Sequence, residues 1–312
     1  MNHKLKMKLR ALSHESKAFS KLYRMASGIK TRRKQNMSDE EFIKQKYKEN
    51  TGKELNLDNP QTFNEKLQWL KLYNHDPLYT TLVDKYAVKQ YVADKIGAEH
   101  VIPVVGGPWK SAEDIDFDAL PEQFVLKCNH DCGSVVICTD KTKLNIPAVR
   151  AKLNKALKHN YYYDGREWPY KNVKPCIFAE KYMVDESGYE LKDYKFFCFN
   201  GEPKCLFIIT GRFSGDMRLD WFDSAFVRMP FERGYPNSNR QFQKPERFEE
   251  MKKLAENLTT SIPFVRCDFY YAQNTVYFGE FTFFPGGGME EFKPPEWDKT
   301  FGDCITLPAK RI

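Results

Sequence analysis

The most constraining feature of the sequence is a pair of β-rich runs near its C-terminus, residues 265–270 and 277–282, with a short polar segment between them. Each run carries one carboxylate, Asp268 in the first and Glu280 in the second, and a hairpin would bring the two together. Arg266 stands two residues before the first carboxylate. Carboxylate oxygens are preferred ligands of Mg²⁺, and arginine pairs well with phosphate. We therefore predict a hairpin that holds Mg²⁺ against a polyphosphate.

The composition indicates a folded protein, since 41% of its 312 residues are hydrophobic and 15% are aromatic. The sequence contains no run of 18 apolar residues, so we expect no transmembrane helix. Its first residues lack the apolar core of a signal peptide. The eight cysteines lie mostly in strand-like runs. Without a secretion signal they are expected to be reduced and buried. We expect a cytoplasmic protein.

The N-terminal segment, residues 1–36, differs in charge from the rest of the chain. It carries eleven Lys and Arg against one acidic residue, whereas the whole chain has a net charge of only +7. The remaining residues are near neutral, so we expect no nucleic-acid partner. Residues 1–30 predict a basic amphipathic helix that can lie on an anionic membrane surface, at the inner face of the cytoplasmic membrane. The alternative is a solvated helix that packs on the main body.

The order of predicted elements favours an α+β fold. Residues 37–97 are mainly helical: a capping box from Thr62 to Glu65 begins one helix, and residues 82–96 predict a second that ends at Gly97. The second half is mainly strands that do not alternate with helices. The predicted strands cover residues 124–127, 134–138, 176–183, 193–199 and 204–210, with a helix at 146–159. We divide the chain into residues 1–36 (arm and linker), 37–97 (helical region) and 98–312.

Two further segments contain residues suited to phosphate. Lys127 ends an apolar strand and must meet an anion or expose its ammonium group. The following loop contains Gly133 and Ser134, whose backbone N–H groups and hydroxyl can bind phosphate. The simpler alternative is an exposed lysine beside an ordinary turn. Three consecutive glycines, residues 286–288, would also let the backbone approach a ligand closely.

Two charged pairs complete the candidate residues. Glu180 and Lys181 end a strand, where neighbouring peptide groups can meet the edge of an adenine; a cross-strand charge pair is the alternative. Asp193 and Lys195 lie on one strand face because side chains alternate with a period of two. They suit ribose and phosphate, and equally a solvated salt bridge.

Taken in order, these residues resemble the ATP-grasp superfamily, and more closely the TupA-like (teichuronopeptide biosynthesis) ATP-grasp family. The likeness is carried by the phrases TFNEKLQWLKLY (62–73), FVLKCNHDCGS (124–134), DYKFFCFNGEPK (193–204) and DFYY…VYFGEFTFFPGGG (268–288), and it covers about residues 55–300. The resemblance implies an ATP-grasp fold in which two α+β subdomains clasp the nucleotide. Residues 120–183 would form the lid subdomain within 98–312.

The resemblance also implies roles for the candidate residues. Lys85 and Lys127 would bind nucleotide phosphates, with Gly133 and Ser134 closing over them. The remaining assignments are the adenine hinge (Glu180, Lys181, Tyr182, Met183), the ribose and phosphate contacts (Asp193, Lys195), the Mg²⁺ ligands (Asp268, Glu280, Thr282) and the residue at the transferred phosphoryl group (Arg266).

The chemistry that the resemblance implies is ATP- and Mg²⁺-dependent ligation. A carboxylate would be converted to an acyl-phosphate, which an amine then displaces, with Lys127 and Arg266 as catalytic cations. The substrates would be a carboxylate-bearing sugar or glycan precursor and an amine donor, in cell-surface polysaccharide synthesis. Thr282 departs from the usual metal-site pattern that the resemblance to the ATP-grasp superfamily implies, which ends Glu-x-Asn. Two alternatives stay open: a glycosyltransferase of the same pathway, and a nucleotide-binding scaffold without turnover.

Overall fold

The computed structural model describes residues 36–185, 191–211 and 215–312. The predicted membrane-binding helix of residues 1–30 lies outside these ranges. Helix α3 (Asp39–Thr51) crosses the boundary between two units of the chain, 1–46 and 47–312. Everything below concerns the second unit. In the described part of the chain, no helix is both long enough and apolar enough to cross a bilayer.

Four short helices begin the second unit. The capping box at Thr62 and Glu65 forms as predicted and starts α4 (Phe63–Tyr73). It is followed by α5 (Pro77–Val83), α6 (Val88–Ile96) and the 3₁₀ turn η1 (Ala98–His100). The prediction of one continuous helix over residues 82–96 is therefore wrong. The chain leaves helical geometry at Asp84, whose carboxylate accepts the backbone N–H groups of Tyr86 and Ala87 and so starts the next turn.

A small antiparallel sheet has the strand order β1-β4-β2-β3. Its strands are β1 (Val104–Trp109), β2 (Phe124–Cys128), β3 (Val135–Cys138) and β4 (Ile177–Lys181). Helix α7 (Ile146–Leu157) packs its buried Val149 and Leu153 into the core beneath this sheet. Short helical turns join the strands: η2 (Ala112–Asp114), η3 (Lys141–Lys143), α8 (Tyr162–Gly165) and η4 (Trp168–Tyr170). Strand β1 runs through Gly106, Gly107 and Pro108 with two irregularities in its pairing with β4.

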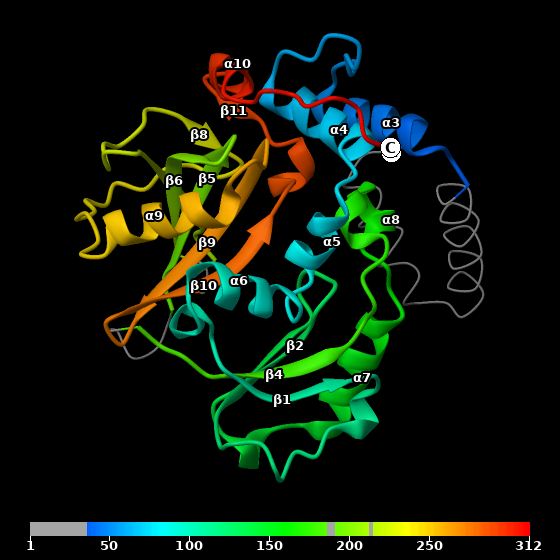
Figure 1. Cartoon of the computed structure of the whole chain (residues 1–312), viewed down its shortest axis with the longest axis vertical. Helices are drawn as coiled ribbons and strands as arrows, with labels where there is room; N and C mark the ends of the chain where they lie inside the picture. Colours follow the sequence, from blue (N-terminus) through cyan, green and yellow to red (C-terminus); the bar gives the residue numbers. More distant parts are fainter. Residues whose placement is uncertain (1–35, 186–190, 212–214) are drawn as a thin grey trace. The chain divides into compact units, whose positions relative to one another are not determined.

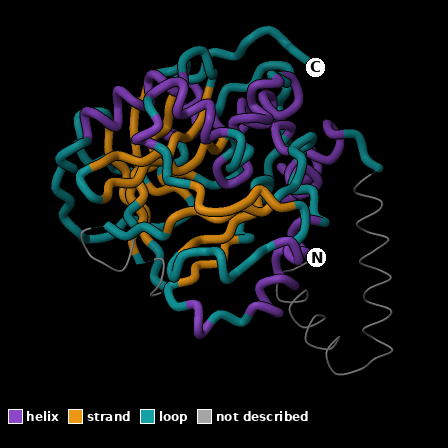
Figure 2. The backbone as a smooth tube through the Cα atoms, turned by 60° about the horizontal axis from the view of Figure 1, so that its bottom comes forward, coloured by secondary structure: helices purple, strands orange, loops and turns teal. Residues whose placement is uncertain are grey.

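A larger antiparallel sheet has the order β10-β9-β5-β6-β7. Its strands are β5 (Asp193–Phe199), β6 (Glu202–Thr210), β7 (Arg218–Asp223), β9 (Phe264–Ala272) and β10 (Thr275–Thr282). Helix α9 (Phe248–Thr259) covers one face, where Phe248 contacts Phe196. The two sheets form separate groups of strands (Figure 1; Figure 2). The predicted α+β class is confirmed.

The opposite face of the larger sheet is divided between an aromatic core and a charged region. Alternation along β5 places Phe197 and Lys195 on this face. Phe197 contacts Phe63 of α4, with ring centroids 5.9 Å apart. The core also includes Phe301 of α10 (Glu296–Asp303) and borders a two-stranded sheet, β8 (Glu232–Arg233) with β11 (Phe292–Lys293). The charged region begins where the aromatic rings end.

Helix α4 also holds the glycine run η5 (Pro285–Gly288). Gln68 Nε2 donates to the carbonyl oxygens of Gly287 and Gly288, at 3.1 and 2.7 Å, and Lys71 Nζ donates to that of Gly287 at 2.7 Å. All three glycines have positive φ angles, between 62° and 65°, which side chains disfavour. The run is therefore an ordered turn fixed by buried polar groups of α4.

Candidate nucleotide-binding site

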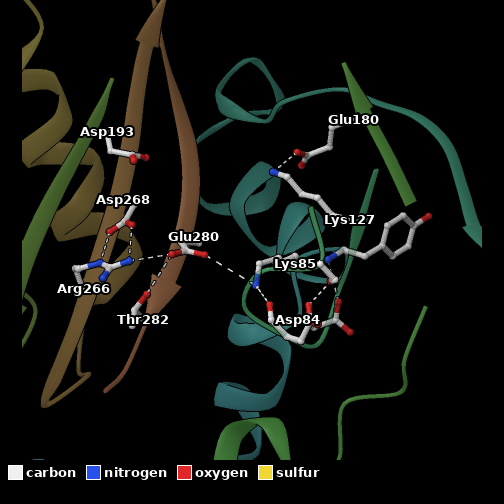
Figure 3. Close-up of polar contacts among 12 residues, drawn as sticks. Asp84, Lys85, Lys127, Glu180, Asp193, Arg266, Asp268, Glu280 and Thr282 are labelled. Atoms are coloured by element: carbon white, nitrogen blue, oxygen red, sulfur yellow. Dashed lines mark hydrogen bonds and ion pairs between the residues drawn. The ribbon is translucent and has the colours of Figure 1, made fainter. Parts of the chain in front are cut away.

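The predicted two-carboxylate hairpin forms, and its turn lies at Gln273 and Asn274 as expected. Asp268 of β9 and Glu280 of β10 are direct partners across the ladder. The pairing shifts by one residue between Phe278 and Glu280, so β10 carries a bulge there. Both carboxylates consequently lie on one face of the sheet (Figure 3). Lys195 lies on the same face, because it pairs with Asp268 across the ladder.

Arg266 joins the two carboxylates. Its Nε and one terminal nitrogen donate to the two oxygens of Asp268, both at 2.7 Å, and that terminal nitrogen also donates to Glu280 Oε1 at 2.8 Å. Burial alone would lower the pKa of Arg266, but the neighbouring carboxylates of Asp268 and Glu280 raise it above its ordinary value. The guanidinium therefore stays charged at the centre of the cluster.

Asp268 is the most enclosed acid of the cluster, with a side chain that is 0% exposed. Besides Arg266, it accepts a short hydrogen bond from Lys195, whose Nζ lies 3.6 Å from Asp193 Oδ1. The prediction that Asp193 and Lys195 share one face is thus confirmed. Burial raises the pKa of Asp268, and the neighbouring cations Arg266 and Lys195 oppose the rise.

Glu280 is more accessible than Asp268, since its side chain is 36% exposed. Its Oε2 points toward Lys85, whose Nζ lies 4.0 Å away, and Thr282 Oγ1 donates to its Oε1 at 3.5 Å (Figure 3). Burial alone would raise its pKa, but Lys85, Arg266 and Lys195 lower the pKa of Glu280 to about 2. The carboxylate is ionised throughout the physiological range.

The oxygens of this cluster fit a hard divalent cation. Two carboxylates and one hydroxyl, from Asp268, Glu280 and Thr282, are ligands of the type that Mg²⁺ takes. Among the described residues there is no group of three or more His, Cys, Asp or Glu arranged around a metal position. A cation held here would therefore depend on Thr282, water or phosphate oxygens for its other ligands.

Lys85 lies in the turn between α5 and α6 rather than in a helix. The carboxylate of Asp84 fixes this turn and also accepts from Asn129 Nδ2 at 2.8 Å. The backbone N–H of Lys85 donates to the carbonyl of Asn129, and its Nζ donates to the carbonyl of Asp131 at 2.6 Å. Lys85 thus connects the loop after β2 with the carboxylates of the larger sheet.

The loop after β2 holds the two residues predicted to cover phosphate. Ser134 is buried, and its hydroxyl donates to the Asp131 carboxylate. Gly133 has a φ of 110°, and a Cβ atom there would meet no atom within 4 Å. Cys132, which lies between Asp131 and Gly133, is exposed, so the prediction that the cysteines are buried is wrong for this residue. The loop therefore borders open space at Gly133.

A second charged cluster lies in the smaller sheet. Glu180 is buried near the end of β4 and receives two lysines: Lys127 of β2 at its Oε2 and Lys89 of α6 at its Oε1, both at 2.5 Å. Burial would raise the pKa of Glu180, but the two lysines keep it below its ordinary value. Of the other predicted hinge residues, Lys181 is exposed, Tyr182 is half-buried, and Met183 packs with Ile102.

Lys89 was not among the predicted site residues. Its only signal in the sequence is its position four residues after Lys85, a spacing that many solvent-exposed lysines share. Ion pairs divide the charged predicted residues into two groups. Lys85 and Arg266 contact Glu280, whereas Lys127 contacts Glu180. Lys85 and Lys89 lie on one short stretch of chain and reach one group each.

Several solved structures are distantly similar to this chain. A D-alanine–D-alanine ligase from Helicobacter pylori is 14% identical, with a TM-score of 0.42 over 80% of this chain and 68% of that chain. The ligase of that name from Bacillus anthracis, complexed with ATP, is 15% identical, with a TM-score of 0.37 over 65% of this chain. Only 53% of that ligase is covered. An L-amino acid ligase from Bacillus licheniformis is 12% identical, with a TM-score of 0.41 over 72% of this chain and 49% of that chain. Likenesses of this size carry no argument about activity.

Sequence comparison identifies the family of the chain. No protein with a curated description matches the chain. The family model described as TupA-like ATPgrasp, however, matches residues 65–306. That range includes every candidate residue described above, from Lys85 to Thr282. The chain belongs to the TupA-like ATP-grasp family and has the ATP-grasp fold.

Proposed function

We propose that the protein is an ATP- and Mg²⁺-dependent carboxylate–amine ligase. The observation that carries the proposal is the cluster in which Arg266 bridges Asp268 and Glu280 while Lys85 faces Glu280 from another part of the fold. Such a cluster has oxygen ligands for a metal and cations for phosphate within one set of contacts. Family membership supports the same reading.

In this proposal the charged residues act by binding and positioning. Lys85 and Lys127 bind the phosphates of the nucleotide, Gly133 lets the loop after β2 approach them, and Ser134 orders that loop through Asp131. Lys127 and Arg266 also neutralise charge that develops on the transferred phosphoryl group, and Lys195 contacts the ribose or a phosphate. ATP supplies that group, and Mg²⁺ would be held by Asp268 and Glu280 with Thr282.

The base and ribose have their own proposed contacts. Residues 180–183, at the end of β4, form the hinge beside adenine, and Asp193 meets the ribose. The activated substrate is a carboxylate, which becomes an acyl-phosphate; an amine then takes the acyl group and releases phosphate. No enzyme nucleophile is required.

The finer substrate assignment rests on the family alone. We propose a carboxylate-bearing sugar or glycan precursor as acceptor and an amine donor, in the synthesis of a cell-surface polysaccharide at the cytoplasmic side of the membrane. The basic residues 1–30 would bring the enzyme to anionic lipid. The division into residues 37–97 and an ATP-grasp domain of 98–312, with a lid of about 120–183, belongs to this proposal.

The test is ADP release from ATP in the presence of uronic acids and amino acids, with and without Mg²⁺. Glu280→Gln and Asp268→Asn should each lower turnover by at least about a hundredfold, because charge stabilisation at the phosphoryl group is lost. Glu291→Gln, which changes an exposed carboxylate, is the matched control. Turnover that survives both site variants contradicts the site assignment.

A thermal-shift comparison separates the other functions. The proposal expects ATP with Mg²⁺ to stabilise the protein more than any nucleotide sugar does. A larger shift with nucleotide sugars would instead indicate a glycosyltransferase. ATP binding without turnover of any carboxylate and amine pair would indicate a scaffold.

A further inference from the structure

Lys89 is largely enclosed, with a side chain that is 13% exposed, at a junction of three elements. From α6, its Nζ contacts Glu180 Oε1 of β4 at 2.5 Å and donates to the carbonyl of Ile102, just before β1, at 2.9 Å. It also lies 5.8 Å from the centre of the Phe178 ring. These contacts hold its ammonium group in place, so Lys89 is not directed at a bound nucleotide.

Lys89 and Lys127 share Glu180 as a partner, so the charge of Lys89 affects the electrostatic environment of Lys127. The two lysines approach different oxygens of this one carboxylate. The three side chains together therefore carry one surplus positive charge. If Lys89 were neutral, Lys127 and Glu180 would form a balanced buried pair with no surplus charge.

We infer that Lys89 is a positioning residue for nucleotide binding: it neutralises Glu180, and the charge of Lys127 thereby remains available to a phosphate. This inference rests on the proposed function, which gives Lys127 a phosphate to bind. Lys89 acts through Glu180 and touches neither the nucleotide nor the reacting atoms. The effect is electrostatic, and therefore it depends on Glu180 being a carboxylate.

That dependence supplies the experiment. The dissociation constant of ADP is measured by calorimetry for the full chain and for Lys89→Met, each with Glu180 intact and in the Glu180→Gln background. With Glu180 intact, Lys89→Met should weaken ADP binding about tenfold, comparable to the loss of one charge-assisted hydrogen bond. In the Glu180→Gln background, Lys89→Met should change the constant by less than about twofold.

A purely structural role predicts a different pattern. If Lys89 only held α6 in place through the carbonyl of Ile102, its loss would weaken ADP binding equally in both backgrounds, and that result overturns the inference. Lys89→Arg, which keeps the charge, should bind ADP more tightly than Lys89→Met does. Lys95→Met, an exposed lysine of the same helix, is the matched control and should bind as the unmodified chain does.

Failure of the inference is distinguishable from failure of the proposed function. An unmodified chain that binds ADP, together with a Lys89→Met variant that binds it equally well, overturns the inference alone. An unmodified chain that does not bind ADP overturns both. The double variant Lys89→Met/Glu180→Gln keeps the surplus of one positive charge that the unmodified cluster has, so it remains informative if Lys89→Met by itself fails to fold.

Discussion

Glu280 lies opposite Asp268 because strand β10 bulges at Gly279. Before the bulge, Phe278 pairs with Phe269; after it, Glu280 pairs with Asp268. An unbroken ladder from the same turn would place Gly279, not Glu280, opposite Asp268. Because side chains alternate between the faces of a sheet, the unbulged hairpin would put the two carboxylates on opposite faces. The bulge therefore assembles the proposed metal site.

Gly279→Ala should disrupt this site. A Cβ atom at position 279 would lie 3.0 Å from the ring of Tyr270 and 3.1 Å from the carbonyl oxygen of Asp268. We expect the free energy of unfolding to fall by about 1–3 kcal/mol, as for other overpacked sites, together with a loss of Mg²⁺-dependent turnover. Urea denaturation and ADP release measure the two effects. Thr275→Ala, in the same strand before the bulge, is the control; a fully active Gly279→Ala enzyme would show that the bulge is not needed.

Asp84→Ala should loosen the turn that presents Lys85. The substitution removes the acceptor for the N–H groups of Tyr86 and Ala87 and for Asn129 Nδ2. We expect a loss of about 1–2 kcal/mol of stability, typical of a helix cap, and weaker ADP binding. Asn145→Ala removes the cap of α7, away from the two charged clusters, and should cost stability without changing ADP affinity. Equal affinity losses in both variants would argue against a specific role for the turn.

The low pKa of Glu280 predicts a pH dependence of stability. The pKa of Glu280 is lowered from 4.5 to about 2 in the folded chain, so the ionised carboxylate stabilises the fold above about pH 4.5. This contribution should disappear as the pH falls through about 2. The difference in unfolding free energy between the unmodified chain and Glu280→Gln should therefore shrink between pH 5 and pH 2, as measured by urea denaturation at each pH. A difference that stays constant over this range would mean that the cations do not lower this pKa.

Gly302→Ala tests the contact between α10 and the start of α4. A Cβ atom at position 302 would lie 2.2 Å from the carbonyl oxygen of Gln61 and 2.8 Å from the backbone nitrogen of Phe63. Backbone atoms cannot move aside as a side chain can, so we expect a loss of about 1–3 kcal/mol in thermal or urea unfolding. Thr300→Ala, an exposed position of α10, should change stability much less. If Gly302→Ala lost no more stability than Thr300→Ala, α10 would tolerate displacement from α4.

The parts of the site that could be predicted are those set by local chemistry. The two-residue turn at Gln273 and Asn274, the capping box at Thr62, and the shared face of Asp193 and Lys195 each follow from neighbouring residues. The expectation that Asp268 and Glu280 meet was right in outcome. The prediction did not include the bulge, because a glycine in a strand does not by itself show which residue is left unpaired with the neighbouring strand.

The missed features depend on distant partners. The apolar periodicity of residues 82–96 continues through Asp84, and the contact of Asp84 with Asn129, 45 residues later, adds to its local turn contacts in favouring a break in the helix. Lys89 has its partner Glu180 on a strand of the smaller sheet, which a local pattern in α6 cannot indicate. The strand through Gly106 likewise forms because β4 supplies its hydrogen bonds.

The hydrogen bonds from α4 to the glycine run limit how the sequences of these two segments can change within the family. Gln68 and Lys71 satisfy carbonyls that lie 216 to 220 residues further along the chain. A helical region taken from one relative would not fit the glycine turn of another unless both had changed in step. The two segments should therefore covary across the family, and a chimaera joined at residue 98 should inherit a misfitted glycine turn just after β10, the strand that carries Glu280 and Thr282.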